Sequence, residues 1–164
     1  MMLGMSLSTF TTVHVIISLV GIGSGLIVMF GMLSSKRLDG WTALFLLTTV
    51  LTSVTGFLFP FTHITPGHKV GVISLVVLAV TLLARYSFHM VGKWRSIYVI
   101  TAIIAEYLNV FVLVVQGFEK VPVLHAMAPT QSEPPFLVAQ LVVMALFIVL
   151  TIFAVKKFHP ESGR

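Results

Sequence analysis

Long apolar segments alternate with short polar ones along almost the whole chain. Five of these segments contain about 20 predominantly apolar residues, the length that a helix needs to cross the hydrocarbon core of a bilayer. Strict alternation of apolar and polar residues, which the strands of a transmembrane barrel would show, is absent. We therefore predict an all-α fold, in which a single membrane domain over residues 1–164 contains five transmembrane helices. The expected spans cover approximately residues 11–33, 41–60, 70–90, 97–117 and 136–155.

The polar connections between the predicted spans are short, with one exception. Short connections make consecutive helices antiparallel neighbours in a compact bundle. The exception is the outer loop predicted over residues 118–135. Loops of this length in compact domains are often functional. Residues 123–128 within it are apolar enough to form a short turn of helix on the membrane surface.

The composition supports the assignment to a membrane and narrows the chemistry. Hydrophobic residues make up 57% of the chain and charged residues 9%, whereas soluble domains carry about 25% charged residues. Cysteine is absent, which excludes disulfides, thiol catalysis and thiolate metal sites. The net charge of +5 comes from basic residues at the ends of the apolar segments. There they are expected to contact lipid head groups, so the partner is the lipid bilayer and not nucleic acid.

Lysine and arginine are distributed unequally between the two ends of the predicted spans. Cytoplasmic loops of membrane proteins carry an excess of these residues. One end holds only Lys69 and Lys120, and Arg85 lies within the third span. The sequence therefore predicts an N-terminus outside the cell and a C-terminus in the cytoplasm. No lysine or arginine precedes residue 36, so a cleavable signal peptide is not expected and the first span is retained. The other seven basic residues lie at the predicted cytoplasmic end: Lys36, Arg37, Lys93, Arg95, Lys156, Lys157 and Arg164.

The first span carries a stripe of small and polar residues. His14, Ser18, Gly21 and Gly25 recur at helical spacing on one face. Gly21 and Gly25 form a GxxxG pair, which lets another helix approach closely. The stripe predicts helix packing, either within the chain or between copies in a homo-oligomer.

The fourth span contains Glu106 close to its middle. A carboxylate at this depth is expected to face the bundle interior, with a partner or a proton. Asn109 and Gln116 extend the polar side of this helix toward its outer end. Arg85 in the third span is the expected partner, and His89 lies four residues further on the same face. Two interpretations stay open: an ion pair that fixes the two helices, or a track for protons or ions.

Four of the six histidines fall at the predicted outer face: His14, His63, His68 and His125. Imidazole is the commonest metal ligand, and a b-type haem requires two axial ligands from different helices at one depth. His14 and His68 meet that requirement for depth. The chain has no recognised zinc spacing such as H-E-x-x-H, and no histidine lies deep inside a span. The cofactor is therefore left open, with haem b and a divalent metal as candidates of which neither is favoured.

Three segments, TGFLFPF, LHAMAPTQSEPPF and RYSFHMVGKWR, resemble those of a family of small polytopic inner-membrane proteins found in bacteria. The resemblance covers most of the chain from Leu38 onward. It implies a multi-pass protein of the bacterial inner membrane, and it transfers no activity and no catalytic residues.

No catalytic signature is present in the sequence. The leading functional hypothesis is a non-enzymatic membrane protein, either an accessory subunit of a larger membrane complex or a small binding bundle. The second is a proton- or ion-coupled transporter or channel that uses Glu106, Arg85 and His89. The third is a redox protein that holds haem or a metal with the outer histidines.

Overall fold

The computed structural model of the chain describes residues 4–60 and 62–160, and these form an all-helical fold without a β-strand. The predicted domain over residues 1–164 thus includes residues 1–3, 61 and 161–164, which lie outside the described part. The helical elements are α1 (Leu7–Leu33), α2 (Asp39–Phe57), α3 (Pro66–Leu82), the π-helical turn η1 (Leu83–Ser87), α4 (Lys93–Lys120), α5 (Pro122–Met127) and α6 (Pro134–Lys157).

Five helices are long and apolar enough to cross a membrane, which confirms the predicted number. They are α1, α2, α3 continued by η1, α4 and α6. Most are longer than the predicted spans because a helix begins at its cap and not at its first apolar residue. Helix α1 begins at Leu7, where the Ser6 side chain accepts a hydrogen bond from the backbone N–H of Thr9 at 3.2 Å. Such a cap satisfies one of the free N–H groups of the first turn.

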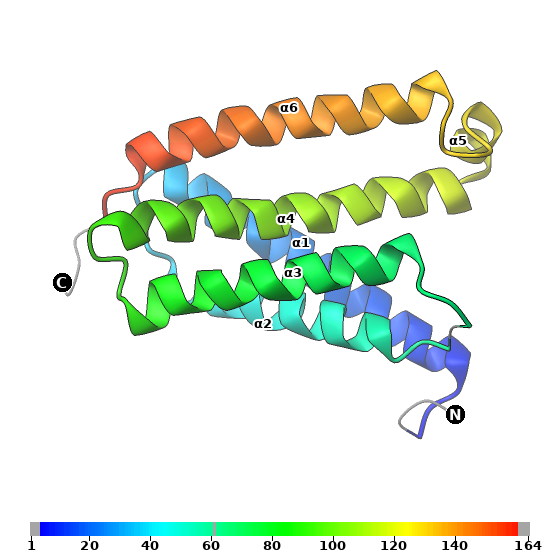
Figure 1. Cartoon of the computed structure of the whole chain (residues 1–164), viewed down its shortest axis with the longest axis horizontal. Helices are drawn as coiled ribbons and strands as arrows, with labels where there is room; N and C mark the ends of the chain where they lie inside the picture. Colours follow the sequence, from blue (N-terminus) through cyan, green and yellow to red (C-terminus); the bar gives the residue numbers. More distant parts are fainter. Residues whose placement is uncertain (1–3, 61, 161–164) are drawn as a thin grey trace.

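The helices form an up-and-down bundle in which α4 has a central position (Figure 1). Helix α1 packs along α2, α3 packs between α2 and α4, and α6 packs mainly on α4. Figure 1 shows α6 on one side of the bundle, beside α4, and little of this helix is buried. The side chains of Leu137, Val138 and Leu141 on this helix are accordingly exposed.

The buried core lies toward the end of the bundle where α4 begins. Phe45, Tyr98, Val99 and Ile103 are almost completely buried there. At the same end, the guanidinium of Arg95 donates hydrogen bonds to the carbonyls of Val155 at 2.9 Å and of Phe158 at 2.8 Å. Helices leave their last carbonyls without partners, so Arg95 closes the end of α6 and attaches it to α4.

The predicted outer loop contains a short helix. Helix α5 (Pro122–Met127) covers most of the apolar segment at 123–128, as expected, and α4 extends to Lys120. Beyond α5, the hydroxyl and backbone N–H of Thr130 donate to the carboxylate of Glu133. The side-chain hydrogen bond from Thr130 is the main cause that lowers the pKa of Glu133 below its ordinary value. These bonds fix the turn that leads into α6.

Candidate functional site

A cavity of about 580 Å³ lies between α1, α2, α3 and α4 in the half of the bundle nearest α5. Its size falls within the range of small-molecule sites, about 300–1,000 Å³. Four of its lining side chains are between 37% and 51% exposed: Val15 and Leu19 on α1, and Val112 and Leu113 on α4. The cavity is therefore open to the side, between α1 and α4, through an apolar opening.

Polar groups are distributed over several walls of this cavity. They include the amides of Asn109 and Gln116 and the ammonium group of Lys120, all from α4. The other polar lining residues are Thr11, His14, Ser18, Thr52, Ser53, Thr65, His68 and Ser74. No acidic residue contributes to the wall among the described residues. The cavity thus combines apolar surface with hydrogen-bond donors and positive charge, which suits a molecule with an acidic or carbonyl-containing head.

His14 is held in a defined orientation by α2. Its Nδ1 lies 2.7 Å from Oγ1 of Thr55, and that hydroxyl in turn donates to the carbonyl of Leu51 at 2.6 Å. Since the hydroxyl proton is used on the carbonyl, Nδ1 of His14 is the donor in the first bond. The neutral ring therefore carries its proton on Nδ1 and keeps a lone pair on Nε2. The ring edge also contacts Phe59, with centroids 5.1 Å apart.

His68 has the opposite tautomer because it belongs to the cap of α3. The backbone N–H of Thr65 donates to Nδ1 of His68 at 3.1 Å, and the Thr65 hydroxyl accepts from the backbone N–H of His68. This reciprocal arrangement is a capping box. Since Nδ1 accepts a hydrogen bond, the neutral ring carries its proton on Nε2. That nitrogen then lacks the lone pair with which it would bind a metal.

The structure does not bring the four outer histidines together. His63 is exposed and contacts the hydroxyl of Thr62, and His125 is exposed on α5. Among residues 4–60 and 62–160, no three His, Cys, Asp or Glu side chains are placed to hold one metal ion. His14 and His68 do line one cavity, but the tautomer of His68 does not fit axial ligation of a haem iron through Nε2. The described residues thus do not assemble the four histidines into one metal site.

The glycine stripe of α1 is used inside the chain. A Cβ atom at Gly21 would lie 3.2 Å from the Thr48 hydroxyl and 3.4 Å from that of Thr49, both on α2. At Gly25 it would overlap the Oε2 atom of Glu106 on α4 and lie 2.9 Å from the Phe45 ring. Both glycines are buried. This face is therefore not available to a second copy of the chain, which corrects the expected route to a homo-oligomer.

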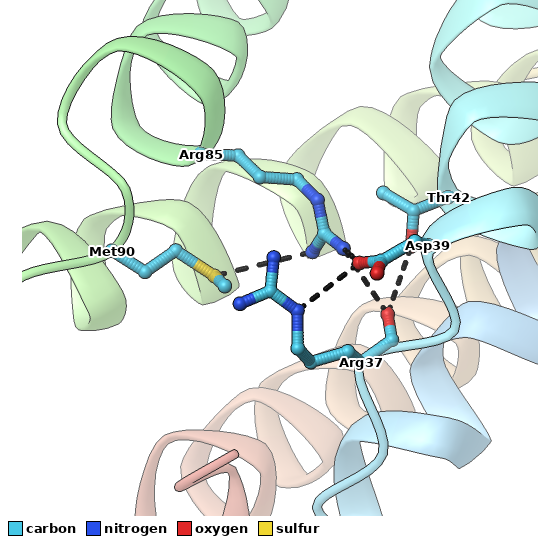
Figure 2. A network of polar contacts seen from close by, with 5 residues as sticks. All are labelled: Arg37, Asp39, Thr42, Arg85 and Met90. Atoms are coloured by element: carbon cyan, nitrogen blue, oxygen red, sulfur yellow. Dashed lines mark hydrogen bonds and ion pairs between the residues drawn. The ribbon is translucent and has the colours of Figure 1, made fainter. Parts of the chain in front are cut away.

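Arg85 is paired with Asp39 and not with Glu106. Figure 2 shows its guanidinium turned toward the loop before α2, where it donates to the carboxylate of Asp39 and, at 3.3 Å, to the carbonyl of Arg37. The plane of Tyr98 lies under it, 5.0 Å from the guanidinium carbon to the ring centroid. Arg85 is 3% exposed, whereas the Asp39 side chain is 69% exposed, so this pair joins a buried guanidinium to an exposed carboxylate at the α1–α2 turn. The expected ion pair between Arg85 and Glu106 is corrected accordingly.

Arg85 lies within the π-helical turn η1. In η1 the backbone N–H of Phe88 donates to the carbonyl of Leu83 at 2.9 Å, which is a five-residue step. The wider turn shifts the direction of the side chains that follow it, and π turns of this kind are frequent at functional sites. His89 follows in a left-handed conformation (φ 51°) and is exposed. It contributes nothing to the surroundings of Glu106, so the three residues of the predicted track are not assembled.

Two features of the site were not predicted from the sequence. Asp39, the only aspartate in the chain, was not among the predicted site residues. Its position at the start of a span, at the same expected depth as Arg85, was the signal that would have identified it. The cavity itself was missed, although Asn109 and Gln116 on α4 and Ser18 on α1 are the polar stripes that line it.

These observations define the class of the protein as a helical bundle with five helices that can cross a membrane and a cavity that is open to the side. In comparisons with protein families, curated proteins and solved structures, none matches the chain. The geometry of the site therefore carries the functional proposal.

Proposed function

We propose that the protein is a non-enzymatic, multi-pass membrane protein that binds a lipid-soluble molecule with an acidic head group. It acts as a small binding bundle, alone or as the ligand-binding subunit of a larger membrane complex. The observation that carries this proposal is the cavity of about 580 Å³ with its apolar opening between α1 and α4. A ligand dissolved in the bilayer would enter through that opening without crossing water.

The charge of the lining supports an acidic head group. Lys120 contributes positive charge, and His68 and the amides of Asn109 and Gln116 contribute hydrogen-bond donors. A carboxylate that enters this environment gains charge-assisted hydrogen bonds, which are roughly twice as strong as neutral ones. The alkyl part of the molecule would contact the aliphatic residues of α1 and α4.

A change that fills the cavity tests this function. The probe is parinaric acid, a fluorescent long-chain carboxylate, and its saturable binding is measured with nanodiscs that contain the protein. We expect Ser18→Trp to weaken this binding by at least about tenfold. A loss of about 1.4 kcal/mol of binding free energy has this effect. Ile16→Trp is the matched control, because Ile16 is on the same helix, 56% exposed and outside the cavity. Equal binding by the two variants would exclude the cavity as the site.

The head group is tested separately with Lys120→Gln. The variant is expected to weaken binding of parinaric acid and to leave binding of its uncharged methyl ester unchanged, because only the acid interacts with the ammonium group. An equal loss for both probes would contradict recognition of an acidic head.

We further propose that the protein lies in the bacterial inner membrane with the cavity at the outer face. Two features support this: the excess of lysine and arginine at the opposite end of the bundle and the resemblance to bacterial inner-membrane proteins.

The absence of cysteine from the chain makes the topology easy to test. Ser132→Cys in the loop after α5 should react with a membrane-impermeant maleimide in intact cells. Ser34→Cys, at the end of α1, should react only after the cells are opened. The reverse pattern would overturn the orientation.

A further inference from the structure

Glu106 is completely buried, and neither of its carboxylate oxygens has a hydrogen-bond partner among the described residues. The carboxyl group lies against the backbone of Gly25, where any side chain would overlap it, and close to Phe45. The space that it occupies exists only because Gly25 has no Cβ. Helices α1, α2 and α4 are thus packed around a carboxyl group that forms no hydrogen bond within residues 4–60 and 62–160.

No charged group in the described part of the chain forms an ion pair with this carboxyl. The only ion pairs among the described residues join Asp39 to Arg37 and Arg85. The helices around Glu106 carry other ionisable side chains, which lie in the cavity, at the ends of the bundle or elsewhere along α4. None of them is bonded to Glu106. They are His14 on α1, Asp39 on α2, His68 and Lys69 on α3, Arg85 and Tyr86 on η1, Lys93, Arg95, Tyr98, Tyr107, Glu119 and Lys120 on α4, and Lys156 and Lys157 on α6.

An ionised carboxylate without a partner is costly in such surroundings. The close contact with Gly25 leaves no room there for a hydrated cation. The ligand that suits this carboxyl is therefore the smallest cation, a proton.

A single polar layer separates Glu106 from the cavity. Asn109 lies one turn further along α4, lines the cavity, and donates from Nδ2 to the Thr49 hydroxyl at 3.2 Å. On the facing helix, Gly21 is one turn from Gly25 and lies against the hydroxyls of Thr48 and Thr49. Hydroxyl and amide groups at this layer, together with the small volume of Gly21, give a proton a short path to the cavity.

The opposite direction is apolar. Between Glu106 and the Arg85–Asp39 pair, α4 contributes Val99, Ala102 and Ile103, all buried at 1% or less exposure. Phe45 and Met32 belong to the same core. Tyr98, over which Arg85 lies, is eight residues from Glu106, about 12 Å along the helix. No hydrogen bond between described side chains bridges this layer.

We propose that Glu106 is a proton-binding site that exchanges its proton with the cavity and not with the opposite end of the bundle. This inference goes beyond ligand binding, because it holds whether or not the cavity is occupied.

Infrared spectroscopy of protein labelled with ¹³C at the glutamate side-chain carboxyl tests the proposal. At pH 7 we expect a band of a protonated carboxyl in the wild type that is absent from Glu106→Gln. On transfer to D₂O this band should shift as deuterium replaces the proton. If Glu106→Gln removes only carboxylate absorption, Glu106 is ionised and the proposal is wrong.

The rate of that shift tests the path. The near-isosteric double variant Thr49→Val/Asn109→Leu should slow the exchange by at least about tenfold, the effect of a 1.4 kcal/mol higher barrier. Thr81→Val is the matched control, since Thr81 is also a fully buried threonine but lies on the apolar side, with its hydroxyl bonded to the Val77 carbonyl. In this control, the Glu106 carboxyl should exchange its proton for deuterium at the wild-type rate. Exchange that is slowed by Thr81→Val and not by the double variant would overturn access from the cavity.

Both results are read only from variants whose helical circular dichroism and thermal unfolding match the wild type. If the double variant fails to fold, Asn109→Leu alone replaces it, with the same expected direction.

Discussion

Alanine at Gly25 is expected to destabilise the folded protein by about 1–3 kcal/mol, the typical effect of adding a methyl group to a filled core. The new Cβ would overlap Oε2 of Glu106 and lie 2.9 Å from the Phe45 ring. The Glu106 side chain is completely buried, so the residues packed around it have to accommodate any shift of its carboxyl. Either the carboxyl and the Phe45 ring or the helices α1 and α4 have to move. Unfolding of the purified protein in mixed micelles, followed by circular dichroism, measures the change.

Gly23→Ala is the matched control for this prediction. Gly23 lies on the same helix, and a Cβ there would meet nothing within 4 Å. The control should be neutral or stabilised by up to about 1 kcal/mol through the higher helix propensity of alanine.

A double-mutant cycle tests whether the new Cβ at position 25 overlaps the Glu106 carboxyl. Combined with Glu106→Ala, which empties the space that the carboxyl occupies, Gly25→Ala should lose most of its effect. Additive effects of the two changes would show that the carboxyl does not occupy the space beside Gly25.

Asp39→Ala is expected to destabilise the protein by about 3 kcal/mol, and by more than Arg85→Met does. Removing one partner of a buried ion pair leaves the other charge without compensation and costs about 3–5 kcal/mol. Arg85 is the buried partner, at 3% exposure, whereas the Asp39 side chain is 69% exposed. Loss of the aspartate therefore leaves a buried guanidinium, while loss of the arginine leaves a carboxylate that water and Arg37 still solvate. The expected value lies at the low end of the range because one partner is exposed.

Two further variants make this prediction specific. Arg37→Gln removes only an exposed ion pair and should cost less than about 1 kcal/mol. The double variant Asp39→Ala/Arg85→Met should be more stable than Asp39→Ala alone, since it removes the uncompensated charge. Equal effects of Asp39→Ala and Arg37→Gln would mean that the Arg85–Asp39 pair does not hold the α1–α2 turn against α3.

The polar residues of α4 show how far the sequence could go. A glutamate and an asparagine three residues apart in an apolar segment had to lie on the interior side of a helix, because lipid does not solvate them. That much could be predicted. Whether Arg85 reaches Glu106 could not be predicted, because the sequence gives the depth of a side chain in a span only to about one turn. Arg85, which lies within the π turn η1, pairs with Asp39 at the end of the bundle instead.

The glycine stripe of α1 illustrates the same limit. The spacing of Gly21 and Gly25 predicts a close approach of another helix, whichever chain provides it. The structure places Thr48 and Thr49 of α2 against the first glycine and Glu106 of α4 against the second. Which helix approaches depends on how all five pack together, and no local pattern contains that information.

The histidines were the least predictable part. Their positions near the ends of the spans could be read from the sequence, but their tautomers depend on single hydrogen bonds. Nδ1 of His14 donates to a hydroxyl on another helix, 41 residues away in sequence, and Nδ1 of His68 accepts from its own cap. Whether such a ring can bind a metal is decided by these contacts and not by spacing.

The sequence by itself determined the five apolar helices, because the backbone in lipid permits few other structures and each span must have the thickness of the bilayer. It also determined that the interior of the bundle contains polar side chains, since lipid does not solvate them. Only the tertiary structure decided that Arg85 pairs with Asp39, that Glu106 lies against Gly25 without a hydrogen-bond partner, and that a cavity open to the side lies above it. Those features arise from side chains of helices far apart in sequence, and their contacts are fixed by packing alone.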